Sequence, residues 1–213
     1  MHAQHDLDSL WGVWQNTEEA DTNRLEALKL YAWEGYLFYE PDSAFYFSQL
    51  QYDYAEKKGL YKYMGKALNT QGVAMYLLDD VESAIEYYQK SVEYHKKAGD
   101  EKGAYGVLNN MGNIYYDQGN FDQAIKNYEE CKDIMLTMGE EEKSIMVLNN
   151  LGLVYSDKGD YSNAMDYFNL GLKLAEKYQN NTQMVNTLNN IGILYSNIEE
   201  YEKAIDYFDK SLS

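Results

Sequence analysis

The sequence predicts an all-α protein: a right-handed superhelical solenoid of about five helical hairpins, preceded by a capping helix. Three observations support this prediction, namely an internal repeat of 40 residues, apolar side chains at helical spacing, and the composition. The 213 residues include 23 Tyr but a single Pro, which disfavours a β-sandwich with its many turns. At 45% hydrophobic residues, the chain is also too apolar for a disordered acidic tail.

The repeat is marked by four glycines that are spaced by 40 residues. Each follows a Leu-Asn segment, as in the run from Leu148 to Gly152. An alanine lies twelve residues beyond each glycine, and an aromatic residue lies sixteen beyond it. The glycines are Gly72, Gly112, Gly152 and Gly192, the alanines are Ala84, Ala124, Ala164 and Ala204, and the aromatic residues are Tyr88, Tyr128, Phe168 and Phe208. A weaker unit precedes these four, with Ala32 in place of the glycine and Ala44 in the alanine series.

Each unit contains two stretches with apolar or small residues at the positions i, i+3, i+4 and i+7, which is the pattern of one helix face. In the unit around Gly112, the first stretch comprises Leu108, Met111, Gly112 and Tyr115, and the second comprises Phe121, Ala124, Ile125, Tyr128 and Cys131. Small residues in the Gly112 and Ala124 series would let the two helices approach closely. A single hairpin cannot bury both faces, so the hairpins are expected to stack.

Turn residues divide the units. We expect Gly119 and Gly159 to end the first helix of their hairpins in the left-handed conformation, and Asp80, Asn120 and Asp160 to cap the second helix. Gly59, Gly99 and Gly139 mark the end of the second helix, and Asn180-Asn181 is expected to take their place in the next unit. Pro41 is expected at the start of a helix, where its missing N–H has no cost.

These boundaries predict two segments: a capping helix with a linker over residues 1–22, and a solenoid over residues 23–213. The solenoid units are expected at about 24–60, 64–99, 104–139, 144–179 and 184–213. The capping helix is inferred from the apolar stripe Leu7, Leu10, Trp11 and Trp14. Ser213 lies near the end of a second helix without a polar capping helix after it, so we expect a fragment of a longer protein or an end that meets another chain.

The charge balance argues against nucleic acid as a partner, because the formal net charge is −17. No apolar run is long enough to span a membrane, and one cysteine, Cys131, excludes an internal disulfide. His2, His5 and His95 lack metal-ligand spacing, and no catalytic or phosphate-binding motif occurs. We therefore expect no catalytic residue, no metal and no cofactor, and we expect Cys131 to be a buried, inert thiol.

These positions resemble the tetratricopeptide repeat. The resemblance covers residues 24–213 and rests on the Leu, Gly, Tyr, Ala, aromatic and small-residue slots, as in Leu108, Gly112, Tyr115, Ala124 and Tyr128. The chain departs from that family in its spacing of 40 instead of 34 and in lacking the Pro that often closes the second helix. Longer units of this kind resemble those of Pins-type adaptors, kinesin light chains, Rap-like regulators and, most closely, the sensory modules of bacterial histidine kinases and adenylate cyclases. The segments 21–24 and 41–44 carry that last comparison.

The resemblance implies a concave groove lined by the first helix of each hairpin. The candidate peptide-binding residues are Lys66, Asn69, Tyr76, Asn109, Asn113, Tyr116, Asp117, Asn149, Asp157, Asn189 and Asn197. The wider predicted lining includes Val73, Met146, Leu153, Asn186 and Ile193. Asn69, Asn109, Asn149 and Asn189 would form a ladder, which either pairs with the amides of an extended peptide or bonds adjoining hairpins and holds the stack. The second asparagines, Asn110, Asn150 and Asn190, are expected to be structural.

The function expected from this pattern is a non-enzymatic protein- or peptide-binding module, the sensory or scaffold part of a larger bacterial signalling protein. An alternative is a dimerisation module that pairs two chains through the C-terminal end and couples downstream domains. Only Asn113 and Lys66 fit the Lys and Asn slots that grip a terminal carboxylate in chaperone-tail adaptors, so that ligand is disfavoured. The location stays open: extracytoplasmic if the chain belongs to a membrane sensor, and cytoplasmic otherwise.

Overall fold

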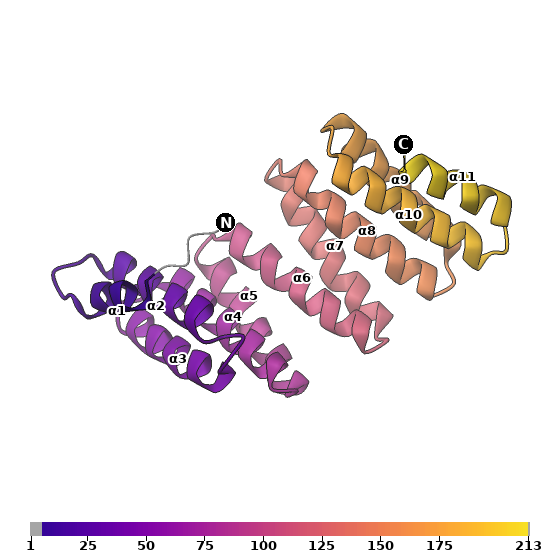
Figure 1. Cartoon of the computed structure of the whole chain (residues 1–213). Helices are drawn as coiled ribbons and strands as arrows, with labels where there is room; N and C mark the ends of the chain where they lie inside the picture. Colours follow the sequence, from indigo (N-terminus) through magenta and orange to yellow (C-terminus); the bar gives the residue numbers. More distant parts are fainter. Residues whose placement is uncertain (1–5, 213) are drawn as a thin grey trace. The chain divides into compact units, whose positions relative to one another are not determined.

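A computed structural model describes residues 6–212 and contains eleven α-helices and no β-strand in that range (Figure 1). The helices are α1 (Leu7–Gln15), α2 (Asp21–Gly35), α3 (Pro41–Lys57), α4 (Tyr61–Leu77), α5 (Val81–Lys97), α6 (Glu101–Asp117), α7 (Phe121–Thr137), α8 (Glu141–Asp157), α9 (Tyr161–Lys177), α10 (Asn181–Asn197) and α11 (Tyr201–Ser211). The all-α prediction is therefore confirmed. His2, His5 and Ser213 lie outside the described residues.

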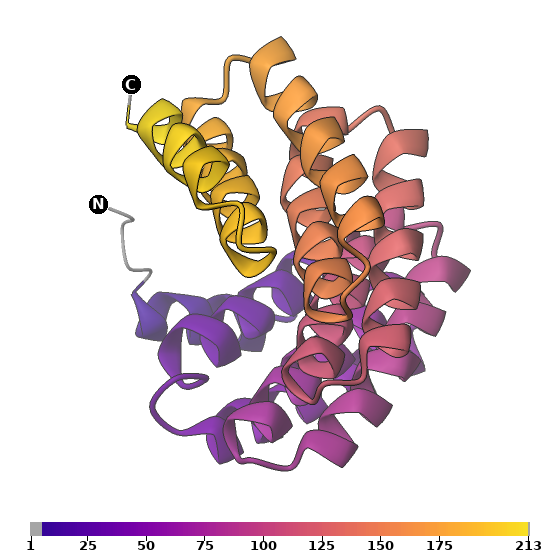
Figure 2. The same ribbon diagram turned by 90° about the vertical axis from the view of Figure 1, so that its right-hand side faces the viewer.

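After α1, the helices alternate between a first and a second member of a hairpin (Figure 2). We call α2, α4, α6, α8 and α10 the A helices, and α3, α5, α7, α9 and α11 the B helices. Each B helix follows its A helix after a short turn, and α3, α7 and α9 also pack against the A helix of the next hairpin. This is the predicted stack of hairpins.

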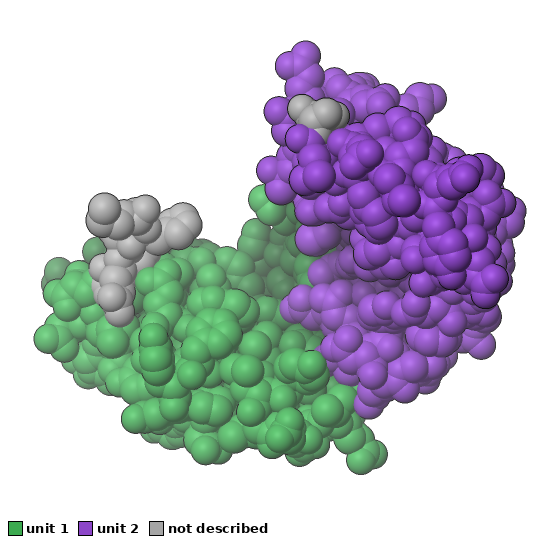
Figure 3. Space-filling model, turned by 45° about the vertical axis from the view of Figure 1, so that its right-hand side comes forward, with its two compact units in different colours: residues 1–107 green, residues 108–213 purple. Residues whose placement is uncertain are grey.

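The chain divides into two compact units, residues 1–107 and residues 108–213, with the boundary inside α6 (Figure 3). In unit 1, one core cluster joins Leu25, Ala55 and Met64. In unit 2, a core cluster joins Ala164 and Phe168 with two residues of α10, Ile191 and Leu194. The expected division into residues 1–22 and 23–213 stays a prediction.

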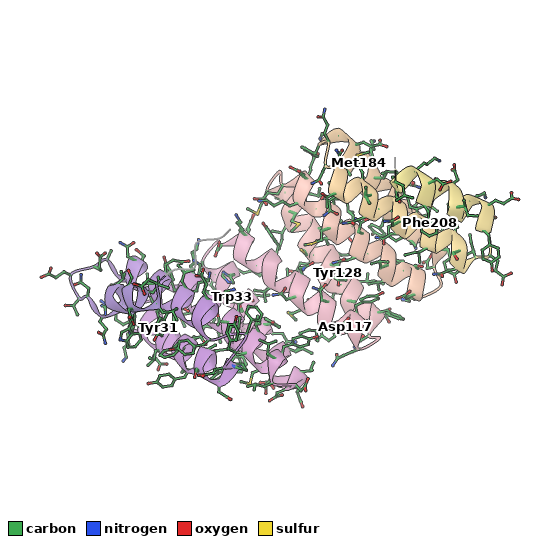
Figure 4. The ribbon with its side chains drawn as sticks, in the orientation of Figure 1. Tyr31, Trp33, Asp117, Tyr128, Met184 and Phe208 are labelled. Carbon is green, nitrogen blue, oxygen red and sulfur yellow. The ribbon has the colours of Figure 1, made fainter. Side chains whose placement is uncertain are left out.

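The glycine series receives the aromatic rings of the B helices. A Cβ built on each glycine would lie too close to a ring carbon: 2.8 Å at Gly72 from Tyr88, 2.5 Å at Gly112 from Tyr128, 2.4 Å at Gly152 from Phe168 and 2.6 Å at Gly192 from Phe208. Figure 4 labels two of these rings, Tyr128 and Phe208. The small residue is thus needed for a particular ring and not only for the general approach of the two helices.

The first hairpin has a different pair of residues in these two slots. Ala32 replaces the glycine and Ser48 replaces the ring, and both are fully buried. The Ser48 hydroxyl donates to the carbonyl of Phe45 at 2.9 Å. A smaller partner on the B helix therefore accompanies the larger residue on the A helix, as close packing requires.

The turns follow the predicted pattern with one correction. Gly59, Gly99, Gly119, Gly139 and Gly159 all have positive φ, between 63° and 81°, so the predicted left-handed positions are confirmed. The prediction for Asn180-Asn181 is wrong. Gln179 has the positive φ of 53°, and Asn180 instead caps α10 by accepting a hydrogen bond from the backbone N–H of Gln183 at 3.1 Å. The error is one of register, because residue 179 lies 40 after Gly139 although it is not a glycine.

The predicted helix starts are confirmed. Asp80, Asn120 and Asp160 each accept a hydrogen bond from the backbone N–H three residues later, at 3.0, 3.4 and 3.2 Å respectively. Pro41 is the first residue of α3.

Helix α1 covers the first hairpin with aromatic side chains. Trp11 lies 5.1 Å from Tyr31 and 5.8 Å from Phe47, measured between ring centroids (Figure 4 labels Tyr31). Arg24 donates to the carbonyl of Trp14 at 2.9 Å and lies over its ring. These contacts give α1 the capping position that its apolar stripe predicts.

His95 of α5 is a buried titratable group in unit 1, with 2% of its surface exposed. Its Nδ1 lies 2.9 Å from a carboxylate oxygen of Asp100, and Lys62 of α4 lies 3.5 Å from the other oxygen. Its ring occupies space left by two glycines, because a Cβ on Gly65 or Gly103 would lie 2.8 or 2.1 Å from ring atoms. Burial lowers the pKa of His95, although Asp100 acts in the opposite direction.

No helix in the described part of the chain is both long and apolar enough to cross a membrane.

The glycine slot can be tested with two substitutions of the same kind. Gly152→Ala should lower the free energy of unfolding by about 1 to 3 kcal/mol, because its Cβ meets the buried Phe168 ring. Gly106→Ala in α6, where nothing lies within 4 Å, should raise it by about 0.5 to 1 kcal/mol through helix propensity. Urea denaturation measures both values. Equal effects of the two alanines would contradict this account.

Protonation of His95 should destabilise the fold. Because the folded pKa is lowered, the unfolded chain takes up a proton first as the pH falls below the ordinary value of 6.5. The free energy of unfolding should therefore fall between pH 7 and pH 5.5, above the range where carboxylates titrate. His95→Gln should flatten this part of the profile in urea denaturation. An unchanged slope would show that His95 does not cause it.

Candidate functional site

Unit 2 contains an open groove of about 350 Å³ between two neighbouring A helices. All of its lining residues come from α8 and α10: Met146, Asn149, Asn150, Leu153, Gln183, Asn186, Asn189 and Asn190. Five of these, namely Met146, Asn149, Leu153, Asn186 and Asn189, belong to the lining that the sequence predicts. The groove therefore lies where A helices from successive hairpins run side by side.

Carboxamide groups dominate this groove. Six of the eight lining residues are Asn or Gln, the other two are Met and Leu, and none is charged. Helix α10 has no charged residue in its 17 positions, although the chain carries 35 Asp and Glu. Each carboxamide offers both donors and an acceptor, so the groove can pair with polar groups of either kind without a net charge.

Asn149 holds adjoining hairpins together. It is 6% exposed, and its Oδ1 lies 3.0 Å from the hydroxyl of Thr187 on α10. Its Nδ2 donates to Oε1 of Gln183 at 3.4 Å. These contacts correspond to the stack-holding interpretation of the asparagine ladder. They leave little of Asn149 for a ligand, which its neighbours in the groove would have to contact instead.

The second asparagines also line the groove. Asn150 donates from Nδ2 to Oδ1 of Asn109 at 3.5 Å and links α8 to α6, while Asn150 and Asn190 both belong to the lining. Sequence reasoning assigned these two residues to structure, and it did not include Gln183. A usable signal was present, because Asn150 and Asn190 recur at the 40-residue spacing as regularly as Asn149 and Asn189.

Other predicted residues lie near the C-terminal ends of the A helices in unit 2. The Tyr116 hydroxyl donates to Asp157 at 2.5 Å and joins α6 to α8. Burial and the nearby Asp157 carboxylate raise the pKa of Tyr116 to about 12. Asn113 accepts a hydrogen bond from Tyr128 at 2.6 Å. Asp117 and Asn197 are exposed and are not part of the groove lining.

The remaining three predicted residues belong to unit 1. Lys66 forms an ion pair with Glu26 at 2.5 Å. Asn69 has a buried Oδ1 without a hydrogen-bond donor, and Tyr76 is 39% exposed. The assignment of a ligand to any of these eleven positions stays a prediction.

The chemistry of the described residues agrees with the inert thiol that was expected. Cys131 is fully buried in α7, and burial raises its pKa to about 12. Within residues 6–212, no group of three or more His, Cys, Asp or Glu side chains is placed to hold a metal ion.

The link between Asn149 and the next hairpin can be tested by exchanging a hydroxyl and a methyl group. The Thr187 hydroxyl lies within reach of Asn149 Oδ1 and of the Gln183 carbonyl, at 3.0 and 2.8 Å. Thr187→Val should lower the free energy of unfolding by about 1 to 3 kcal/mol, because a buried acceptor loses its donor. Val107, at the equivalent position in unit 1, lies 80 residues before Thr187.

Val107→Thr is the matched substitution. It would bring a hydroxyl toward the unpaired Oδ1 of Asn69 and should raise the free energy of unfolding by up to about 1 kcal/mol. Urea denaturation compares the two variants. If both lose the same stability, the asparagine links contribute nothing specific.

Comparison with known proteins agrees with this geometry. A family model described as tetratricopeptide repeat matches residues 63–135, 103–177 and 143–213, which together run through more than half of the chain. No curated protein matches the sequence.

Solved structures share the fold at low sequence identity. The structure of BtubC (BKLC) from P. vanneervenii is 20% identical with a TM-score of 0.68, and the match covers 81% of this chain and 71% of that one. The apo form of RapI is 13% identical with a TM-score of 0.78, over 96% of this chain and 57% of that one. A Rap protein complexed with competence and sporulation factor is 14% identical with a TM-score of 0.69, over 97% and 68%.

At these identities the solved structures establish the fold alone, and this chain spans little more than half of RapI. The family follows from the sequence match, which coincides with hairpins α4/α5 to α10/α11. The chain belongs to the tetratricopeptide repeat family.

Proposed function

We propose that the chain is a non-enzymatic module that binds an extended peptide or protein segment in the groove between α8 and α10. The observation that carries this proposal is the lining of six carboxamides and two apolar side chains without a charge. An extended peptide presents alternating N–H and C=O groups, and carboxamides can satisfy both. Met146, which is 46% exposed, and Leu153 offer apolar contact to a side chain of that peptide.

Within the groove, the ligand contacts would come mainly from Asn186 and Asn190. Asn149 is buried and bonded to Thr187 and Gln183, whereas Asn186 is exposed and Asn190 is partly exposed. Because the lining has no charge, the affinity should depend weakly on salt concentration. This separates the proposed ligand from an acidic or basic tail, whose affinity salt would weaken.

A sensory or scaffold role in a larger signalling protein is the biological setting that we propose for this binding. It is supported by the likeness in fold to a Rap protein that was solved in complex with competence and sporulation factor. In a sensor, ligand binding would change the arrangement or order of the hairpins. In a scaffold it would leave them unchanged, and hydrogen exchange with and without ligand distinguishes the two.

A second candidate function is pairing of two chains through the C-terminal hairpin, which would couple downstream domains. It is favoured by three exposed apolar side chains near that end: Tyr201 at 59%, Ile205 at 59% and Leu212 at 86%. Light scattering over a range of protein concentrations tests it.

The groove can be tested with peptides selected from a random twelve-residue library on the full chain. Replacing both Asn186 and Asn190 by Ala should weaken these peptides about tenfold or more, the loss expected from two hydrogen bonds of about 1 kcal/mol each. Fluorescence anisotropy measures the affinity. Asn169→Ala, an exposed asparagine of α9 outside the groove, is the control and should have no effect. Peptides that bind the double variant as well as the unmodified chain would refute the groove assignment.

A further inference from the structure

The outer side of α11 carries an apolar stripe. Tyr201, Ile205 and Leu212 are spaced by four and seven residues, so they lie on one face of the helix, which we call the α11 face. They are 59%, 59% and 86% exposed. This face is therefore an uncovered apolar surface on unit 2.

The preceding hairpin shows what covers the same face elsewhere in the stack. Met165 and Leu172 occupy the positions on α9 that Ile205 and Leu212 occupy on α11. Both are partly buried in a cluster that contains Ile191 of α10. The B-helix face is thus covered by the A helix of the following hairpin.

Two carboxylates lie beside the α11 face, at Glu202 and Asp209, and both residues are exposed. The equivalent carboxylates on α7 are Asp122 and Glu129, and both have partners in the following hairpin. Lys158, in the turn between α8 and α9, pairs with Asp122 at 2.5 Å. The hydroxyl of Tyr167 on α9 donates to Glu129.

Helix α9 provides the contrast. Its residues at these two positions are Ser162 and Asn169, which carry no charge. The hairpin that follows α9 has Ile198 where Lys158 would be, while Tyr207 keeps the tyrosine position. Within unit 2, the turn lysine therefore accompanies the acidic pair and is absent where the pair is neutral.

We propose that the α11 face docks a helical hairpin of a partner protein. That hairpin carries an apolar A-type stripe, which covers Tyr201, Ile205 and Leu212, and a basic residue in its turn, which meets Glu202. The template is the contact that α7 already makes with the α8/α9 hairpin, in apolar packing as in charge. The proposal does not depend on the groove.

The charges favour this occupant over a second copy of the chain. A second copy would bring the same two carboxylates to the interface. The lysines of α11 are paired elsewhere, Lys203 with Glu200 at 2.9 Å and Lys210 with Asp206 at 2.6 Å. The hairpin of this chain that does carry the fitting lysine, α8/α9, already covers α7.

The test uses the full chain and a synthetic peptide of residues 140–178, which contains the α8/α9 hairpin, in isothermal titration calorimetry. The unmodified peptide should bind, and Ile205→Asp should abolish its binding. Glu202→Lys should weaken binding about fivefold, the size of a surface ion pair. A peptide carrying Lys158→Glu should recover that loss on the Glu202→Lys chain. Asp166→Lys, an exposed carboxylate of α9, is the control with the same change in charge and should have no effect.

Three results would overturn the proposal. These are no binding of the unmodified peptide, unchanged binding to Ile205→Asp, and a loss with Glu202→Lys that the Lys158→Glu peptide does not recover. Self-association of the full chain in light scattering, if Ile205→Asp removes it, would assign the face to a second copy instead. Replacing Asn186 and Asn190 by Ala should leave the peptide affinity unchanged, so a failure here is distinguishable from a failure of the groove.

Discussion

The contact between a glycine on the A helix and an aromatic ring on the B helix determines how each hairpin closes. A ring at Tyr88, Tyr128, Phe168 or Phe208 lies where the Cβ of its glycine would be, so the two helix axes can be close while a large apolar side chain is buried between them. The first hairpin uses Ala32 with Ser48, and the two slots change size in opposite directions. The constraint therefore acts on the pair of positions and not on the glycine alone.

The surfaces available for binding follow from this arrangement. Because the B-helix rings fill the space inside each hairpin, the polar residues of the A helices are left to contact the next hairpin or solvent. Asn149 does the former through Thr187 and Gln183, and Asn186 does the latter beside the groove. The B helices in turn present their outer faces to the following hairpin. On α11 that face is exposed, and it carries the same acidic pair that α7 directs at Lys158.

The sequence predicts most of the fold, since the 40-residue period fixes the helix order, the turn glycines and the caps at Asp80, Asn120 and Asp160. It is less informative where a residue type departs from its slot. Gln179 adopts the left-handed turn conformation because the turn geometry of the repeat outweighs its own preference. At the site, the lining was predicted in part, but the separate roles of Asn149 and Asn150 were not. Those roles depend on a partner in another hairpin, such as Thr187, where the other repeats have Val107 and Val147.

A double-mutant cycle of Gly152 and Phe168 measures the central contact most directly. The account predicts that Gly152→Ala is strongly destabilising in the presence of Phe168 and nearly neutral in a Phe168→Leu background, because the added Cβ clashes with the ring alone. The free energies of unfolding from urea denaturation should then show a coupling of about 1 kcal/mol or more between the two positions. Additive effects would mean that the glycine is required for a reason other than the ring, and would contradict the account.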